Sequence, residues 1–126
     1  MPRAARILLV EDDATLLGLT EASLVEAGYD VQSRRDARDA LALMVSDRDI
    51  DLLITDMSMP WMNGDDLVRA IRRIAPGVPV LYVTGHDVSV LRAANGGGIG
   101  TTYMQKPYTL EELHASVAAL VGRDAA

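Results

Sequence analysis

Short runs of apolar residues alternate along the chain with segments in which apolar residues recur at helical spacing. The strongest runs are rich in Ile, Leu and Val, which is typical of strands that are buried on both faces of a sheet. The run at 29–33 is short and polar, which favours a position at the sheet edge. The pattern therefore predicts five strands, at residues 7–10, 29–33, 50–55, 78–84 and 101–105.

The segments between these strands have the apolar period of amphipathic helices. The first segment places a stripe on one face and ends at Gly28, because glycine commonly follows a helix C-terminus. That stripe comprises Leu16, Leu19, Ser23, Leu24 and Ala27. Similar spacing predicts helices over residues 36–46, 67–74, 88–94 and 110–121, whereas residues 95–100 are too rich in glycine to be helical.

Regular alternation of strands and helices predicts an α/β fold, with a parallel sheet covered by helices on both faces. Crossovers between parallel strands are right-handed, so the carboxyl ends of all the strands lie along one edge of the sheet. We see no internal repeat or linker. We therefore expect a single domain over residues 1–126, with a core of about residues 5–121.

Composition narrows the classes of function. The 126 residues carry a formal net charge of −6 and no cysteine, so disulfides and thiolate metal sites are excluded. The acidic balance argues against direct binding to nucleic acid, and the arginines at 34, 35 and 38 are interpreted as a solvated surface. The sequence has no membrane-spanning stretch and no signal-peptide core, so we expect a cytoplasmic protein.

Acidic, hydroxyl and ammonium side chains gather at the predicted strand ends. Glu11 and Asp12 follow the first strand, Asp56 follows the third, Thr84 ends the fourth, and Lys106, the single lysine, follows the fifth. Each residue alone has a structural explanation, such as helix capping or an Asx turn. Three carboxylates at one edge repel one another, however, unless a cation or a proton neutralises them. Their convergence therefore favours a functional site.

The residue types at this edge suit phosphoryl transfer. Carboxylate oxygens are good ligands for a hard cation such as Mg²⁺. A carboxylate beside such a cation can attack phosphorus and form an acyl phosphate. The cation, a lysine and a hydroxyl can then neutralise the charge on the phosphoryl oxygens.

Four motifs at the strand ends resemble those of the receiver domains of bacterial two-component response regulators. They are LLVEDD at 8–13, LITDMSMPWMNG at 53–64, VTG at 83–85 and YMQKPY at 103–108. The resemblance covers essentially the whole chain. It implies a flavodoxin-like, doubly wound (βα)5 fold with a five-stranded parallel sheet of order 2-1-3-4-5, in a phosphoprotein of a phosphorelay.

The resemblance assigns the phosphoacceptor and its metal ligands. Asp56 is implied to accept a phosphoryl group from a histidine of a sensor histidine kinase or a histidine phosphotransfer protein. Glu11, Asp12 and Asp56 are implied to hold Mg²⁺ together with the backbone carbonyl of Ser58. Lys106 is implied to pair with Asp56 first and with the phosphoryl oxygens afterwards.

Other positions are implied to act in the response to phosphorylation. Thr84 would bond the phosphoryl group, and Tyr103 matches the switch aromatic that turns inward when the threonine moves. Ser58 and His86 lie where the family tunes the lifetime of the phosphoryl group, although His86 is equally well interpreted as a solvated loop residue. Tyr108 stands where phenylalanine is more usual.

The sequence leaves several alternatives open. A pseudo-receiver that is not phosphorylated is a second class, and a Mg²⁺-dependent phosphohydrolase with an aspartyl-phosphate is a third. Ser58 argues against the phosphohydrolase, because such enzymes usually carry an aspartate at that position. We therefore expect no enzyme activity beyond autophosphorylation and autodephosphorylation.

The sequence identifies partners only by class. A downstream protein of unknown identity and a homodimer through the fourth helix, fifth strand and fifth helix are compatible with it. A stand-alone regulator and a receiver from a hybrid histidine kinase are both possible origins. His114, off the apolar face of the last helix, is interpreted as exposed.

Overall fold

A five-stranded parallel sheet forms the centre of the computed structural model, which describes residues 4–47, 49–59, 62–85, 87–89 and 100–122. The strand order is β2-β1-β3-β4-β5, which confirms the predicted doubly wound fold. The elements along the chain are β1 (Arg6–Val10), α1 (Ala14–Glu26), β2 (Asp30–Arg34), α2 (Ala37–Ser46), β3 (Leu52–Asp56), α3 (Gly64–Ile74), β4 (Val80–Thr84), β5 (Thr101–Gln105) and α5 (Leu110–Leu120).

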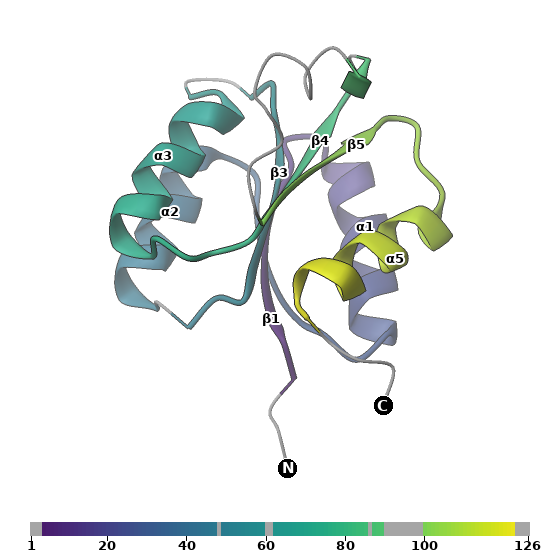
Figure 1. The fold of residues 1–126 in the computed structure, drawn as a ribbon, viewed down its shortest axis with the longest axis horizontal. Helices are drawn as coiled ribbons and strands as arrows, with labels where there is room; N and C mark the ends of the chain where they lie inside the picture. The colour runs from purple at the N-terminus through teal and green to yellow at the C-terminus, as the bar shows by residue number, and fades with distance from the viewer. Residues whose placement is uncertain (1–3, 48, 60–61, 86, 90–99, 123–126) are drawn as a thin grey trace.

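Helices cover the sheet on both faces, with α1 and α5 on one side and α2 and α3 on the other (Figure 1). Alternate residues of each strand serve the two layers. Leu8 and Val10 of β1 belong to the core cluster under α2 and α3, whereas Ile7 and Leu9 belong to the cluster under α1 and α5. Burial on both faces explains why these strands are apolar without alternation.

Side-chain caps define where the helices begin. Asp13 caps α1 by accepting hydrogen bonds from the backbone N–H groups of Thr15 and Leu16, and Asp36, Asn63 and Thr109 cap the other helices that the structure describes. Gly28 follows α1 with φ of 99°, a conformation that glycine adopts without strain, as its predicted role requires.

The prediction of the buried face of α1 was wrong in part. Leu19 is 64% exposed and Ala27 is exposed, while the buried residues of the helix are Thr20 and Leu24. The buried face of the helix includes Thr20 in place of Leu19. Thr20 is polar, and its hydroxyl bonds to Tyr108. Periodicity alone does not reveal such a satisfied polar group.

Other boundaries differ only slightly from the prediction. The fourth strand begins at Val80 instead of 78, directly after Pro79, which has no N–H group to donate to a ladder. The helix predicted over 88–94 and the glycine-rich segment 95–100 lie almost entirely outside the described residues. Among the helices of the described ranges, none is both long and apolar enough to cross a membrane.

Candidate functional site

The carboxylates at the ends of β1 and β3 lie side by side. The strands pair in parallel register, with Val10 opposite Thr55, so Glu11 and Asp56 emerge next to each other. Ligand oxygens of Glu11, Asp12 and Asp56 all lie within 4.8 Å of one another. Glu11 and Asp56 are only 5% and 8% exposed, which makes their mutual repulsion costly in the absence of a neutralising cation.

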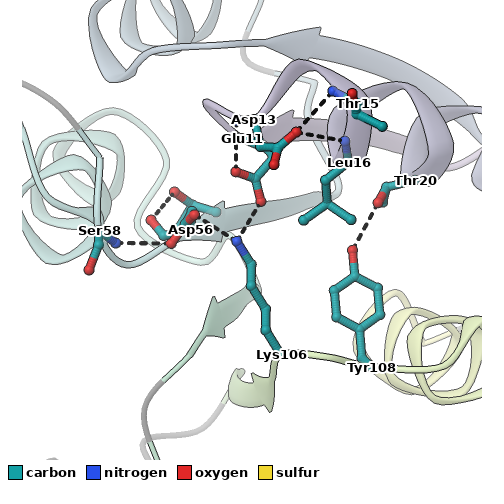
Figure 2. A network of polar contacts seen from close by, with 10 residues as sticks. Glu11, Asp13, Thr15, Leu16, Thr20, Asp56, Ser58, Lys106 and Tyr108 are labelled. Atoms are coloured by element: carbon teal, nitrogen blue, oxygen red, sulfur yellow. Dashed lines mark hydrogen bonds and ion pairs between the residues drawn. The ribbon is translucent and has the colours of Figure 1, made fainter.

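Lys106 supplies a positive charge to this cluster. Its Nζ donates to Glu11 Oε1 at 2.8 Å and to Asp56 Oδ2 at 2.9 Å, so one ammonium bridges two carboxylates (Figure 2). The backbone N–H of Lys106 donates to the carbonyl of Thr84 at 2.6 Å, which fixes the residue at the end of β5. Three carboxylates with one lysine leave an excess of negative charge.

Burial and neighbouring charges perturb both partners of this ion pair. Burial is the largest cause that raises the pKa of Glu11, and the charge of Asp56 adds to it. Hydrogen bonds from Lys106 and from the backbone N–H of Asp13 act in the opposite direction. Burial lowers the pKa of Lys106, but its bonds to the two carboxylates outweigh burial and leave the pKa raised. Lys106 therefore stays charged at neutral pH.

The loop after β3 orients the Asp56 carboxylate. Oδ1 accepts a hydrogen bond from the backbone N–H of Ser58 at 3.0 Å, while Oδ2 accepts from Lys106. The loop returns so closely that a Cβ atom on Gly64 would lie 2.7 Å from the Asp56 carbonyl oxygen and 2.9 Å from the Met57 Cα. In the sequence, Gly64 stands out only as the last residue of the motif at 53–64, so its steric role was missed.

The remaining predicted residues lie at different distances from the cluster. Thr84 is 1% exposed at the end of β4, beside Lys106. Tyr103 is buried in the layer under α3, where it stacks on Tyr82. His86 lies outside the described residues. The structure therefore gathers Glu11, Asp12, Asp56, Thr84 and Lys106 at one edge and places Tyr103 within the core.

Several side-chain contacts of α1 and of the loop before it were not predicted. Tyr108 Oη lies 2.8 Å from Thr20 Oγ1, and His114 Nε2 lies 2.6 Å from Ser23 Oγ. Arg35 donates to the backbone carbonyl of Asp12 at 3.1 Å. The interpretation of His114 as exposed was wrong, since it is half-buried. The unusual tyrosine at 108 was visible in the sequence, but its partner on α1 was not.

The donor set fits a hard divalent cation. Three converging carboxylates offer only oxygen ligands, which Mg²⁺ prefers, and partial exposure of Asp12 leaves room for the waters that Mg²⁺ retains. Ser58, whose backbone carbonyl is the fourth predicted ligand, lies in the loop directly after Asp56. Its backbone N–H donates to the Asp56 carboxylate. The site can thus combine a nucleophilic carboxylate with neutralising groups around it.

These features define a class of protein: a doubly wound α/β domain with an acidic cluster and a bridging lysine at the carboxyl edge of its sheet. The chain belongs to the response regulator receiver domain family, whose model matches residues 7–118. It is therefore a receiver domain of two-component signalling. Such domains are typically non-enzymatic phosphoacceptors that bind Mg²⁺ through acidic residues and interact with histidine kinases or phosphotransfer proteins.

Curated relatives match the chain over almost its full length. An uncharacterized transcriptional regulatory protein of Bacillus subtilis, YrkP, is 40% identical over 120 residues, which are 95% of this chain and 51% of the relative. The response regulator MprA of Mycolicibacterium vanbaalenii is 36% identical over 94% of this chain and 51% of its own length. The chain therefore spans about half the length of these relatives.

Solved structures of similar size have the same fold. A receiver protein of Sinorhizobium medicae superposes with a TM-score of 0.84 at 31% identity, covering 94% of this chain and 95% of that one. The chemotaxis protein CheY4 of Vibrio cholerae superposes with a TM-score of 0.83 at 28% identity, covering 93% of this chain and 98% of that one. The receiver domain of the hybrid histidine kinase CckA superposes with a TM-score of 0.80 at 28% identity, covering 93% of this chain and 99% of that one.

Proposed function

We propose that Asp56 accepts a phosphoryl group from a phosphohistidine of a sensor kinase or phosphotransfer protein. The observation that carries this proposal is the Asp56 carboxylate, oriented by Lys106 and the Ser58 N–H and placed beside Glu11 and Asp12. An Asp56 oxygen bonds to phosphorus as the bond from phosphorus to the imidazole nitrogen breaks. The imidazole keeps the electron pair and takes up a proton, and Asp56 becomes an acyl phosphate.

The neighbouring residues divide the supporting tasks. Glu11, Asp12, Asp56 and the Ser58 carbonyl hold Mg²⁺, which supplies positive charge for the phosphoryl oxygens. Lys106 adds a second positive charge from the end of β5, because its ammonium already reaches Asp56 Oδ2. The exposed Ser58, with His86, tunes access of water to the acyl phosphate. Ser58 lacks the carboxyl group of a general acid, which argues against a phosphohydrolase.

Phosphorylation of Asp56 changes the side-chain packing around β4 and β5. The phosphoryl group adds negative charge at the sheet edge. Thr84 donates its hydroxyl to the new oxygens, and Tyr103 occupies the space that Thr84 leaves. Two packings of this face then differ in stability, and the phosphoryl group favours one of them for partner binding or dimerisation.

A groove close to Asp56 is the proposed docking site for the phosphodonor protein. A groove of about 430 Å³ lies between α1 and the connection from β5 to α5, and Lys106 is one of its lining residues. Leu19 and Leu110 border it and are 64% and 56% exposed. A helix that carries the donor histidine is the proposed occupant, since a partner in this groove lies next to Lys106 and hence next to Asp56.

Intact-mass spectrometry after incubation with acetyl phosphate and Mg²⁺ tests the acceptor. The expected result is one phosphoryl adduct that disappears in Asp56→Asn and in the presence of a chelator. No adduct on protein that binds Mg²⁺ would favour the pseudo-receiver alternative. An adduct that persists in Asp56→Asn would show that another residue is the acceptor.

Four further properties are part of this proposal. Residues 1–126 form a single receiver domain with a core of about residues 5–121, and the domain acts in the cytoplasm. It has no enzyme activity apart from its own phosphorylation and dephosphorylation. Its output is contact with a downstream partner.

A further inference from the structure

We propose that the hydroxyl group of Tyr108 is a positioning group for Lys106. It fastens the connection between β5 and α5 to α1 through Thr20, and so fixes where the lysine ammonium lies. The two hydroxyl oxygens are 2.8 Å apart and connect segments that are 88 residues apart in the sequence (Figure 2). The inference rests on the proposed phosphoryl transfer at Asp56.

The connection that carries Lys106 is short. The N–H of Lys106 donates to the carbonyl of Thr84, and Thr109 already serves as the N-cap of α5. Pro107 has no N–H to donate, so side chains contribute to the anchoring of this segment. The ring of Tyr108 packs against the core cluster under α1 and α5, and its hydroxyl extends from there to α1.

Thr20 is the matching half of this contact. It is 3% exposed and occupies the face of α1 that the apolar pattern assigned to other residues. A buried hydroxyl needs a hydrogen-bond partner, and Tyr108 provides one. Either residue without the other would leave a polar group unpaired, so the two hydroxyls act as a unit.

The Tyr108 contact is the second of two hydrogen-bonded connections between α1 and the segment that carries Lys106. The N–H of Asp13, at the start of α1, donates to Glu11 Oε2 at 3.1 Å, and Glu11 Oε1 accepts from Lys106 at 2.8 Å. Helix α1 is thereby connected to the lysine at two points. Glu11 holds the ammonium, and the pair of Thr20 and Tyr108 holds the backbone beyond it.

The connection through Tyr108 and Thr20 is uncharged, whereas the connection through Glu11 is an ion pair. Lys106 is paired with Glu11 and Asp56, whose surroundings change when a phosphoryl group arrives. The ammonium must then exchange partners. The bond between Tyr108 and Thr20 joins two neutral groups and takes no part in that exchange. It can therefore hold the lysine stem while the ion pairs are rearranged.

Four variants separate this role from general packing. Tyr108→Phe keeps the ring and removes the hydroxyl, and Thr20→Val removes the partner hydroxyl at nearly constant shape. Thr20→Ser retains that hydroxyl and should restore the bond. Ser23→Ala is the matched control, because it removes the 2.6 Å contact between α1 and His114 of α5 without touching the segment that carries Lys106.

The first readout is the rate constant for phosphorylation by acetyl phosphate with Mg²⁺. Tyr108→Phe and Thr20→Val should each slow the reaction about three- to tenfold. The double variant should be no slower than the slower single variant, because both remove the same bond. Thr20→Ser and Ser23→Ala should keep the wild-type rate. Equal slowing by Ser23→Ala would overturn the inference.

The second readout reports the lysine directly and does not need phosphorylation. The chain has a single lysine, so protein labelled with ¹⁵N-lysine gives one side-chain ammonium resonance. Tyr108→Phe and Thr20→Val should shift or broaden it, and Ser23→Ala should not. An unchanged resonance and rate in Tyr108→Phe would reject the positioning role alone. A wild type without an Asp56-dependent adduct would reject the proposed function, and the resonance would still decide this inference.

Discussion

The ring of Tyr103 stacks on the ring of Tyr82, with centroids 5.2 Å apart and planes inclined by 11°. Both rings are buried in the layer under α3. Burial is the main cause that raises the pKa of Tyr82, and the charge of Asp65 and a hydrogen bond to it add to the effect. The residue proposed as the switch is thus held by a second ring that is itself bonded to the first turn of α3.

Two substitutions at Tyr82 should separate the bond from the stack. Tyr82→Phe keeps the ring and should lower the free energy of unfolding by about 0.5–1.5 kcal/mol through loss of the Asp65 bond. Tyr82→Leu should cost about 0.5–1.5 kcal/mol more, because it also removes the stack. Urea unfolding measures both. The ring resonances of Tyr103 should move strongly only in the leucine variant; unchanged resonances there would contradict the coupling of the two rings.

Gly64→Ala should disturb the loop that orients Asp56. The new methyl group would overlap the backbone of Asp56 and Met57, neither of which can rotate away as a side chain can. The expected cost is about 1–3 kcal/mol in unfolding free energy, together with slower phosphorylation.

Gly18→Ala is the matched control for this steric effect. Gly18 lies within α1, and a Cβ atom added there would have nothing within 4 Å, so alanine should raise the unfolding free energy by about 0.5–1 kcal/mol. Similar effects of the two substitutions, in sign and size, would mean that contact with the Asp56 backbone is not what requires glycine at position 64.

The fold and the acidic cluster could be predicted because both follow from local pattern and topology. Uninterrupted apolar runs indicate buried strands, and parallel crossovers bring their carboxyl ends together. Once the strands are placed, Glu11, Asp56 and Lys106 must share an edge. Sheet topology brings strand ends together however far apart they lie in the sequence, so residues from distant segments could be grouped.

The contacts that refine the site follow from tertiary packing and could not be predicted in this way. The period of α1 allowed several stripes, and which one faces the core depends on neighbours such as Tyr108. Thr20 was therefore missed and Leu19 was wrongly placed inside. The close approach of Gly64 likewise depends on the path of a loop that has no periodic signal.

Lys106→Met should destabilise the metal-free protein. The substitution removes two hydrogen bonds to carboxylates and leaves Glu11 and Asp56 without the cation between them. Because the lysine side chain is 26% exposed and partly screened, we expect a loss of about 1–3 kcal/mol in urea unfolding.

Added Mg²⁺ should offset part of this loss, because a bound cation restores positive charge among the carboxylates and stabilises the folded state by mass action. Lys106→Arg keeps a charge and is the matched variant. It should be more stable than Lys106→Met without Mg²⁺, and the difference should narrow in excess Mg²⁺. A Lys106→Met protein that is as stable as wild type in a chelator would contradict the role of the ion pairs.

The raised pKa of Glu11 predicts how stability depends on pH. Its pKa lies above the ordinary value of 4.5 chiefly because the carboxyl group is buried, so the folded protein binds this proton more tightly than the unfolded chain does. From pH 4.5 upward through the raised pKa, Glu11 should therefore make the unfolding free energy fall as pH rises. Glu11→Gln should remove that fall.

Urea unfolding from pH 4.5 to about pH 7 in a chelator tests this dependence. Glu111→Gln removes the same charge at an exposed position of α5 and should retain the wild-type slope. Mg²⁺ should act against the proton, since it binds the ionised carboxylate; in excess Mg²⁺ the contribution of Glu11 should rise with pH. Parallel curves for wild type and Glu11→Gln in both conditions would show that Glu11 is neither the titrating group nor a metal ligand.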